Sequence, residues 1–438
     1  MKLKTSQAVD NRERVFLLGV SLKKSTRFRN GIVERESLLE LEELARSAGA
    51  VVTGSMMQVR EAIDPATLVG KGKLDEVKLE AQMHKAPLII VDHNLTPVQL
   101  RNMEKITECR VIDRTQLILD IFALHARTRE GQLQVELAQL NYMLPRLSGK
   151  GVELSRLGGG IGTRGPGEQK LETDRRRIRD RVGKIQRAID TVRRQRTTRR
   201  QAREAIPLGT IAMVGYTNAG KSTLFNALTH SAVLTSSKMF ATLDPTIRAV
   251  RLPSKRRVLL SDTVGFIREL PPGLIAAFRA TLEEVQEASL ILHVSDISDP
   301  NHSEHDDEVL KILRELGVEE RPRLRVFNKV DRLTPEELAA LTQAPPNGAS
   351  AGSIDGPVFV SAVTGAGLDD LLARIDAALP VDRITHLDLR VPLSDGRTLA
   401  MIYAAGRVLK SELADEVLSL EAEVPESLAR RLTSYTIQ

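Results

Sequence analysis

Short apolar runs and amphipathic stretches alternate through the first part of the 438-residue chain. Apolar runs bounded by polar residues predict strands, and apolar positions that recur every three or four residues predict helices. The pattern predicts strands at 15–20, 50–53, 87–91 and 110–112, and helices at 37–48, 73–84, 97–107 and 115–124. We therefore expect residues 1–125 to form a small α/β domain.

The apolar spacing then lengthens and predicts two long helices packed antiparallel. Leucines step by four, three and four residues through the first helix, and a second apolar seam continues beyond a break. The seam positions are Leu133, Leu137, Leu140, Leu144, Leu171, Ile178, Val182, Ile185, Ile189 and Val192. A glycine-rich tip occupies 147–170 between the two arms, so 126–205 are expected to form a helical hairpin.

Alternating strands and helices return in the rest of the chain. Strands are expected at 210–214, 257–261, 289–294, 324–327 and 357–360, which favours a doubly wound α/β sheet over residues 206–381. Residues 343–356 contain prolines and glycines and are interpreted as a disordered insertion. Residues 382–438 predict a small α/β appendage, either a docking module or a cap on the preceding sheet.

A glycine loop joins the first strand of residues 206–381 to the helix that follows it. Residues 215–223 fit G-x-x-x-x-G-K-[ST], in which backbone N–H groups and a helix N-terminus hold phosphates. Lys221 adds a positive charge, and the Ser222 hydroxyl can ligate Mg²⁺. The expected phosphate-binding residues are Gly215, Tyr216, Thr217, Asn218, Ala219, Gly220, Lys221, Ser222 and Thr223.

Three further motifs each follow a predicted strand, where ligands bind such sheets. After 257–261, the Asp262 carboxylate can hold Mg²⁺ through water and the Gly265 N–H can reach a γ-phosphate. After 324–327, the Asp331 carboxylate can accept both the ring N–H and the exocyclic amine of guanine, a pair that adenine lacks. After 357–360, a backbone N–H can contact the guanine oxygen. The residues expected to bind nucleotide here are Asp262, Thr263, Val264, Gly265, Asn328, Lys329, Asp331, Ser361 and Ala362.

The order of these motifs resembles that of translational, Ras-like P-loop GTPases. The resemblance implies that Lys221 and Gly265 act in catalysis, and adds 240–246 as the first switch. In that switch Phe240 would lie near the nucleotide, while Thr242, rather than Thr246, would be the second protein ligand to Mg²⁺ and a catalytic residue. In such switches the γ-phosphate orders two loops, and hydrolysis releases them.

Two positions, Phe266 and Asn218, bear on how this chain would hydrolyse GTP. Many GTPases carry a glutamine after D-x-x-G that orients the attacking water, but this chain has Phe266. Intrinsic hydrolysis is therefore expected to be slow unless a partner supplies the missing group. Asn218 resembles the asparagine of potassium-stimulated GTPases, or it is a simple turn residue; K⁺ is accordingly a candidate stimulator beside the cofactor Mg²⁺.

A closer resemblance covers the chain from about residue 15 to its end. The glycine-rich motif at 158–168, the following 171–176 and the switch at 240–246 are similar to signatures of the HflX family. The resemblance implies a GTPase that binds the large ribosomal subunit and inserts its hairpin tip near the peptidyl-transferase centre. It further implies that the C-terminal appendage contacts a protein at the stalk base, and that stalled ribosomes are split into subunits by a monomer.

Charge agrees with a polyanionic partner. The chain has a net charge of +6, and residues 174–204 contain thirteen Lys and Arg against four Asp and Glu, a surplus of nine. A basic arm beside a glycine-rich tip favours structured RNA over a merely solvated helix face. Because aromatics are only 3% of residues, recognition is expected to rest on phosphates and shape rather than on base stacking.

Other observations limit the location and the chemistry. No apolar run approaches the roughly 20 residues of a membrane span, and no signal-peptide core follows Met1, so a cytoplasmic protein is expected. The single cysteine, Cys109, excludes an intrachain disulfide. His302, His305, Asp306 and Asp307 are interpreted as a solvated helix start rather than a metal site.

Some alternatives stay open. Residues 69–73 form either an anion-binding turn or, as we favour, a solvated strand-to-helix turn. Two other functions fit the sequence: an RNA-binding regulator with incidental nucleotide turnover, and an assembly or RNA-remodelling NTPase that also uses ATP through its N-terminal half.

Overall fold

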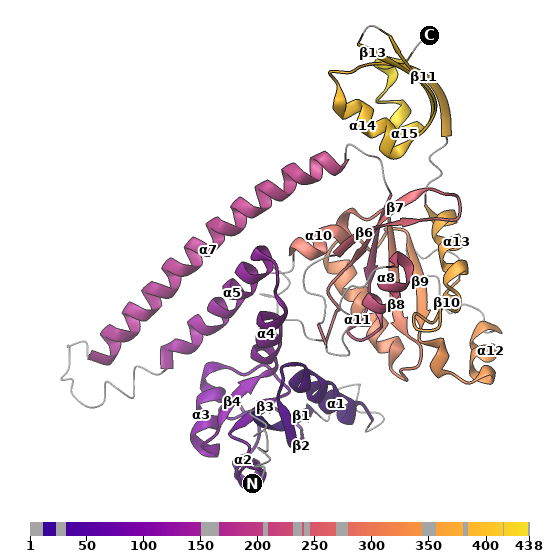
Figure 1. Cartoon of the computed structure of the whole chain (residues 1–438). Helices are drawn as coiled ribbons and strands as arrows, with labels where there is room; N and C mark the ends of the chain where they lie inside the picture. The colour runs from indigo at the N-terminus through magenta and orange to yellow at the C-terminus, as the bar shows by residue number, and fades with distance from the viewer. Residues whose placement is uncertain are drawn as a thin grey trace, which may run out of the picture. The chain divides into compact units, whose positions relative to one another are not determined.

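The computed structural model describes residues 12–22, 32–149, 166–204, 209–230, 239–240, 246–268, 279–343, 356–379, 384–414 and 416–436. Contacts divide the chain into one compact unit of residues 1–189, 236–243 and 269–278, and a second of residues 190–235, 244–268 and 279–438. Most of the glycine-rich tip, residues 241–245 of the first switch and residues 344–355 of the insertion lie outside the described residues. Three sheets and the long helix α7 (Pro166–Glu204) form the framework (Figure 1).

The first sheet is parallel, with the order β2-β1-β3-β4. Its strands are β1 (Arg14–Leu22), β2 (Val51–Arg60), β3 (Leu88–Val91) and β4 (Arg110–Asp113), and its helices are α1 (Ile32–Ser47), α2 (Lys71–Met83), α3 (Pro97–Thr107) and α4 (Arg114–His125). Apolar residues of the strands, such as Phe16 and Ile89, bury Leu74 of α2 and Met103 of α3. The predicted strands and helices are confirmed. β2 extends beyond its prediction because this edge strand is only half-buried and its hydrophobic signal is weak.

The predicted hairpin seam is confirmed at Leu133, Leu137, Leu140, Ile185 and Ile189. Helices α5 (Arg129–Met143) and α7 lie side by side (Figure 1) and bury Leu133, Ile185 and Ile189 between them. Arg181 of α7 donates two hydrogen bonds to Glu136 of α5, at 2.7 and 3.0 Å. Leu144 no longer continues α5, because it begins a short 3₁₀ helix, Leu144–Gly149.

The second sheet has the order β10-β9-β8-β5-β7-β6. Its strands are β5 (Thr210–Val214), β6 (Thr246–Arg251), β7 (Arg257–Asp262), β8 (Leu290–Asp296), β9 (Arg323–Asn328) and β10 (Val358–Phe359). All neighbours pair in parallel except β6 with β7. The five predicted strands are confirmed, and β6 was missed. As an edge strand with mostly exposed or half-buried residues, β6 has little hydrophobic pattern to detect.

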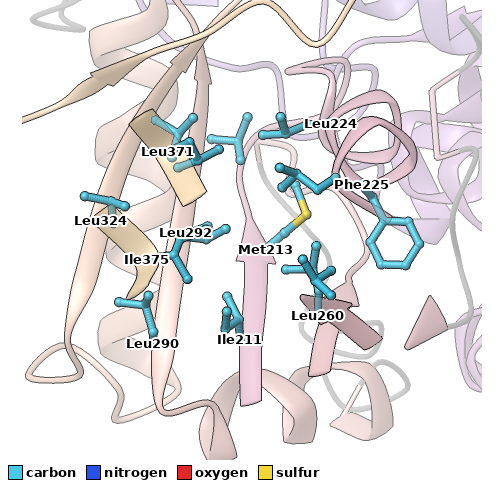
Figure 2. Packing of buried hydrophobic residues seen from close by; sticks show 14 of the residues in the cluster. Ile211, Met213, Leu224, Phe225, Leu260, Leu290, Leu292, Leu324, Leu371 and Ile375 are labelled. Carbon is cyan, nitrogen blue, oxygen red and sulfur yellow. The ribbon is translucent and has the colours of Figure 1, made fainter. Parts of the chain in front are cut away.

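Helices α8 (Lys221–Thr229) and α13 (Leu368–Ala378) cover one face of this sheet. Met213 and Leu260 of the strands pack with Phe225 of α8, and Leu292 packs with Leu371 of α13 (Figure 2). The remaining helices are α10 (Arg279–Glu287), α11 (His302–Glu315) and α12 (Pro335–Gln343), with the 3₁₀ turn Val330–Arg332. The core thus holds the glycine loop between β5 and α8 in place.

The C-terminal appendage is the small α/β unit that the sequence predicts. Its antiparallel sheet has the order β11-β13-β12, from β11 (Ile384–Pro392), β12 (Arg407–Ala414) and β13 (Val417–Pro425). Helices α14 (Gly396–Ala405) and α15 (Glu426–Ala429) supply Ile402 and Leu428 to its core. None of the helices in the described part of the chain combines the length and apolarity needed to span a bilayer.

Candidate functional site

The glycine loop follows β5 directly and ends where α8 begins at Lys221. Other parts of the sheet approach both glycines of the loop, Gly215 and Gly220, too closely for any larger residue. A Cβ on Gly215 would lie 2.1 Å from the Val294 carbonyl oxygen of β8. A Cβ on Gly220, whose φ is +88°, would lie 2.2 Å from Asn328 Nδ2. Neighbouring strands therefore press against the loop at two points, and only glycine permits its path.

Lys221 lies under this loop with only 6% of its surface exposed. Its Nζ donates to the Gly215 carbonyl at 3.1 Å and to the Tyr216 carbonyl at 2.7 Å. Burial lowers the pKa of Lys221 to about 8, an effect that the nearby Asp262 charge partly opposes. The amine is thus held by carbonyls at the position where a phosphate-binding loop needs a cation.

Two oxygen donors for a metal lie together at the start of α8. The Ser222 hydroxyl donates to Asp262 Oδ2 at 2.7 Å, and Asp262, the last residue of β7, is fully buried. Hydroxyl and carboxylate oxygens are ligands that Mg²⁺ prefers, so this pair fits the expected ion. Thr242 lies outside the described residues, and its role as the other ligand stays a prediction.

The D-x-x-G motif continues from β7 toward the glycine loop. The Thr217 N–H donates to the Phe266 carbonyl at 2.7 Å, and the Phe266 N–H donates to the Gly215 carbonyl at 3.0 Å. A Cβ on Gly265 would lie 3.0 Å from Lys221 Nζ and 3.0 Å from Thr217 Cα. The sheet therefore brings Gly265 against the lysine. The side chains of Thr263 and Val264 are buried, which leaves only their backbones for a ligand.

The two predicted guanine motifs meet around Asn328. Its Nδ2 donates to the Ala219 carbonyl at 2.9 Å, and its Oδ1 accepts from the Ala362 N–H at 3.1 Å. The Ser361 hydroxyl donates to Asp331 Oδ1 at 2.5 Å. Asn328 thus links the glycine loop to both motifs and leaves the exposed Asp331 at their rim.

Lys329 has a partner that the sequence analysis missed. Its Nζ lies 2.5 Å from Asp296 Oδ2 at the end of β8. An acidic residue directly after a buried strand was the signal that could have identified it.

Phe240 belongs to the compact unit of the first sheet, whereas the glycine loop belongs to the other unit. Its ring packs edge-on against Phe122 of α4, with centroids 4.5 Å apart, and only 3% of Phe240 is exposed. The preceding Met239 N–H donates to the Ser47 hydroxyl of α1 at 2.8 Å. A contact of Phe240 with nucleotide stays a prediction.

The segment around His302 differs from the solvated helix start that we predicted. Asp306 is only 5% exposed and forms an ion pair with Arg325 at 2.5 Å. Burial alone would raise the pKa of Asp306, but the interaction with His293, a hydrogen bond from Ser295 and the Arg325 charge outweigh it and lower the pKa to about 2. The predicted helix start is confirmed, but Asp306 is not solvated, because its partner Arg325 comes from strand β9.

His305 is also engaged, because its ring stacks on Tyr216. Among the described residues, no group of three or more His, Cys, Asp or Glu side chains is arranged to hold a metal ion.

A mainly parallel sheet, a G-x-x-x-x-G-K-[ST] loop at its central strand and an Asn-Lys-x-Asp loop beside it define a P-loop GTPase. Similar proteins include the GTPase HflX of Caldanaerobacter subterraneus, 45% identical over 92% of this chain and 91% of that protein. The GTPase HflX of Escherichia coli is 43% identical over 91% and 92%. The chain therefore belongs to the HflX GTPase family, and it is a GTP hydrolase.

Family models match most of the chain. Residues 35–123 match the GTP-binding GTPase N-terminal model, and 125–203 match the GTP-binding GTPase middle region. Residues 210–329 match a model described as 50S ribosome-binding GTPase. Among solved structures, a GTP-binding protein from Sulfolobus solfataricus in complex with GDP is 24% identical, with a TM-score of 0.42, over 83% of this chain and 98% of that one.

Proposed function

We propose that this GTPase binds the large ribosomal subunit and splits stalled ribosomes into subunits, with GTP as the conformational switch. The observation that carries the proposal is the basic helix α7, held against α5 by an apolar seam. The printed description of the family model over 210–329, a 50S ribosome-binding GTPase, supports the same partner. As a further part of the proposal, the protein acts as a cytoplasmic monomer.

An arginine stripe on α7 is the surface that we assign to ribosomal RNA. Arg176, Arg187 and Arg194 are exposed and are separated by 11 and 7 residues. Those spacings are about three and two helical turns, which places all three on one face. Ile185 and Ile189, buried against α5, mark the opposite face. The stripe therefore presents charge away from the hairpin seam, where phosphates can reach it.

The nucleotide is proposed to bind as the motifs suggest. Phosphates lie on the loop from Gly215 to Thr223, and the Gly265 N–H contacts the γ-phosphate. The Asp331 carboxylate accepts from guanine, while a backbone N–H of the Ser361-Ala362 motif donates to the guanine oxygen. Ser222 and Thr242, and Asp262 through water, would hold Mg²⁺, and the ion would supply positive charge to the phosphate oxygens.

Hydrolysis is expected to be slow without the ribosome. Phe266 is 3% exposed and carries no group that can orient water. We propose that the large subunit supplies the missing group. We propose that K⁺ stimulates hydrolysis through Asn218, an exposed residue with φ of +62°. Asparagine also adopts this conformation readily in turns. Equal hydrolysis rates in K⁺ and in Na⁺ would therefore mean that Asn218 is only a turn residue.

The first experiment tests the stripe. Replacing Arg176, Arg187 and Arg194 together by Gln should weaken binding to large subunits and lower the slope of log K against log salt by about two to three. The control replaces Arg177, Arg179 and Arg181 by Gln. It removes equal charge from arginines of the same helix whose positions in sequence place them off the face of the stripe. Equal slopes for the two triple variants would contradict the assignment.

The second experiment tests splitting itself. Sucrose-gradient profiles of ribosomes would be recorded with GTP, GDP and a non-hydrolysable analogue. We expect more free subunits with the full chain and GTP. A variant whose residues 150–168 are replaced by a short Gly/Ser turn should bind GTP normally but not split, since the tip is proposed to act near the peptidyl-transferase centre.

Two results would redirect this proposal. Splitting at the normal rate by the tip-deleted variant would assign the work to the GTPase unit or to the C-terminal appendage, which we propose contacts a protein at the stalk base. Binding without splitting by the unmodified protein would favour the RNA-binding regulator instead.

A further inference from the structure

The side chain of Tyr216, the second residue of the glycine loop, makes contacts that phosphate binding by the loop backbone does not explain. Only 6% of Tyr216 is exposed. Its hydroxyl oxygen accepts a hydrogen bond from the Arg268 N–H at 3.0 Å. Arg268 lies three residues beyond Gly265, so this bond ties the loop to the segment that follows the D-x-x-G motif.

Two backbone bonds join the same segments. The Thr217 N–H donates to the Phe266 carbonyl, and the Phe266 N–H donates to the Gly215 carbonyl, which makes an isolated parallel bridge between Tyr216 and Phe266. Any sequence can make these two bonds. The third bond requires a phenol at position 216, because its acceptor is a side-chain oxygen.

His305 of α11 holds the tyrosine ring in its orientation. The two rings stack with centroids 3.9 Å apart and an interplanar angle of 9°. His305 Nδ1 lies 3.5 Å from Asp299 Oδ2. A buried ring stacked on one face has little freedom to rotate, so the hydroxyl stays directed at Arg268.

We propose that Tyr216 is a positioning residue for GTP hydrolysis. It holds residues 265–268 against the phosphate loop, and it depends on His305 for the orientation of its ring. Gly265 already lies so close to Lys221 that an added Cβ would be 3.0 Å from the amine. A shift of this segment therefore moves the Gly265 N–H relative to any phosphate that Lys221 contacts. The inference rests on the proposed contact between the Gly265 N–H and the γ-phosphate.

The main test is Tyr216→Phe, which removes the hydroxyl but keeps the stacked ring. We expect kcat for GTP hydrolysis to fall roughly twofold to tenfold, the scale of one net hydrogen bond. GDP affinity should not change, because GDP has no γ-phosphate for Gly265 to contact. Tyr403→Phe, on a residue of α14 that is 55% exposed, removes the same atom elsewhere and should leave kcat unchanged.

Two results would overturn the proposal. A wild-type kcat for Tyr216→Phe would show that the hydroxyl does not position the segment. A loss of GDP affinity equal to the loss of kcat would make the hydroxyl a structural support of the loop. Gly265→Ala tests the underlying γ-phosphate contact separately: if it hydrolyses GTP normally, the proposed site is wrong, whatever Tyr216→Phe does.

The role of His305 is tested by a double-mutant cycle. In a His305→Ala background, Tyr216→Phe should lower kcat less than it does in the wild type, since the hydroxyl is then already poorly held. His305→Phe keeps a ring for the stack and should retain most of the wild-type kcat. Independent, multiplicative losses in the cycle would remove His305 from the proposal.

Discussion

In the four-stranded sheet, β3 is followed by Asp92 and β4 ends on Asp113; in the six-stranded sheet, β7 ends on Asp262 and β8 on Asp296. These carboxylates lie at the corresponding edge of two parallel sheets, where α/β proteins bind ligands. Their partners differ. The difference shows what turns such an edge into a nucleotide site.

At the first sheet, cations already pair with the acids. Buried Arg114 contacts Asp92 at 2.8 Å and Glu40 at 2.7 Å. Burial alone would lower the pKa of Arg114, but the charges of Glu40 and Asp92 raise it above its ordinary value. Asp113 accepts from Tyr142 at 2.5 Å and from Arg146 at 2.9 Å. The arginines and the carboxylates at this edge thus stabilise one another's charges.

At the second sheet, Asp296 also pairs with a cation, Lys329, but the buried Lys221 is engaged by carbonyl oxygens instead. Lys221 donates to two carbonyl oxygens of the loop, while the nearby Asp262 carboxylate accepts from Ser222. Lys221 is the first residue of α8 and directly follows the glycine loop. The edge of the second sheet thus differs from that of the first because a glycine loop and a lysine held by carbonyl oxygens lie beside its acidic strand end.

The turn at 69–73, which we considered as an anion site, resembles the first case. Lys73 Nζ lies 2.6 Å from Glu76, and the Gly70 N–H donates to Gln58 at 3.3 Å. These groups have partners within the chain, which agrees with the interpretation as an ordinary turn. We do not extend nucleotide binding to the N-terminal half.

The largest expected effect tests the structural role of the cation at the first sheet. Arg114→Leu removes the buried cation that pairs with the half-buried Asp92 and Glu40, so unfolding of this domain should require about 3–5 kcal/mol less free energy. Denaturant unfolding of the full chain measures it, with GDP affinity unchanged. Arg110→Leu removes an exposed partner of Glu13 and should cost less than about 1 kcal/mol. Similar losses of stability in Arg114→Leu and Arg110→Leu would show that the buried ion pairs of the first sheet have no special role.

The next effect concerns the base. Asp331→Asn replaces a carboxylate that accepts two guanine donors by an amide, so preference should move from GTP toward XTP by roughly 2–4 kcal/mol. Competition binding with both nucleotides measures the shift. Asp307→Asn, an exposed acid on α11, removes the same charge and should not alter preference. Unchanged GTP affinity in Asp331→Asn would remove that residue from the site.

The smallest effect, taken per pH unit, is the pH dependence of stability that Lys221 contributes. Its pKa is lowered to about 8 from 10.5, so between these values the unfolded chain binds a proton that the folded chain lacks. Stability without nucleotide should rise with pH across that window, by up to about 1.4 kcal/mol per unit. Phosphate favours the charged amine, so GDP affinity should fall above about pH 8. In Lys221→Met the stability slope should vanish; the same slope in both proteins would assign it to another group.

Local patterns in the sequence determined much of this protein. The strand, loop and helix at 210–229 and the seam of the hairpin could be predicted because each depends on the spacing of neighbouring residues. The glycine loop, the Asp262 motif and the Asn328 motif were found for the same reason: each directly follows its own strand. The sequence also predicted the basic arm, because the net charge of a segment can be counted without knowing what the segment packs against.

Only the tertiary structure decided which segments cover one another. Tyr216 meets His305 and Arg268, and Phe240 meets Phe122, across separations in sequence that no local period encodes. The same holds for Asp306, which the sequence left as a solvated acid although Arg325 and His293 reach it from neighbouring strands. Apolar spacing tells which face of an element is buried. The order of the strands in the sheet decides which residues pack against that buried face.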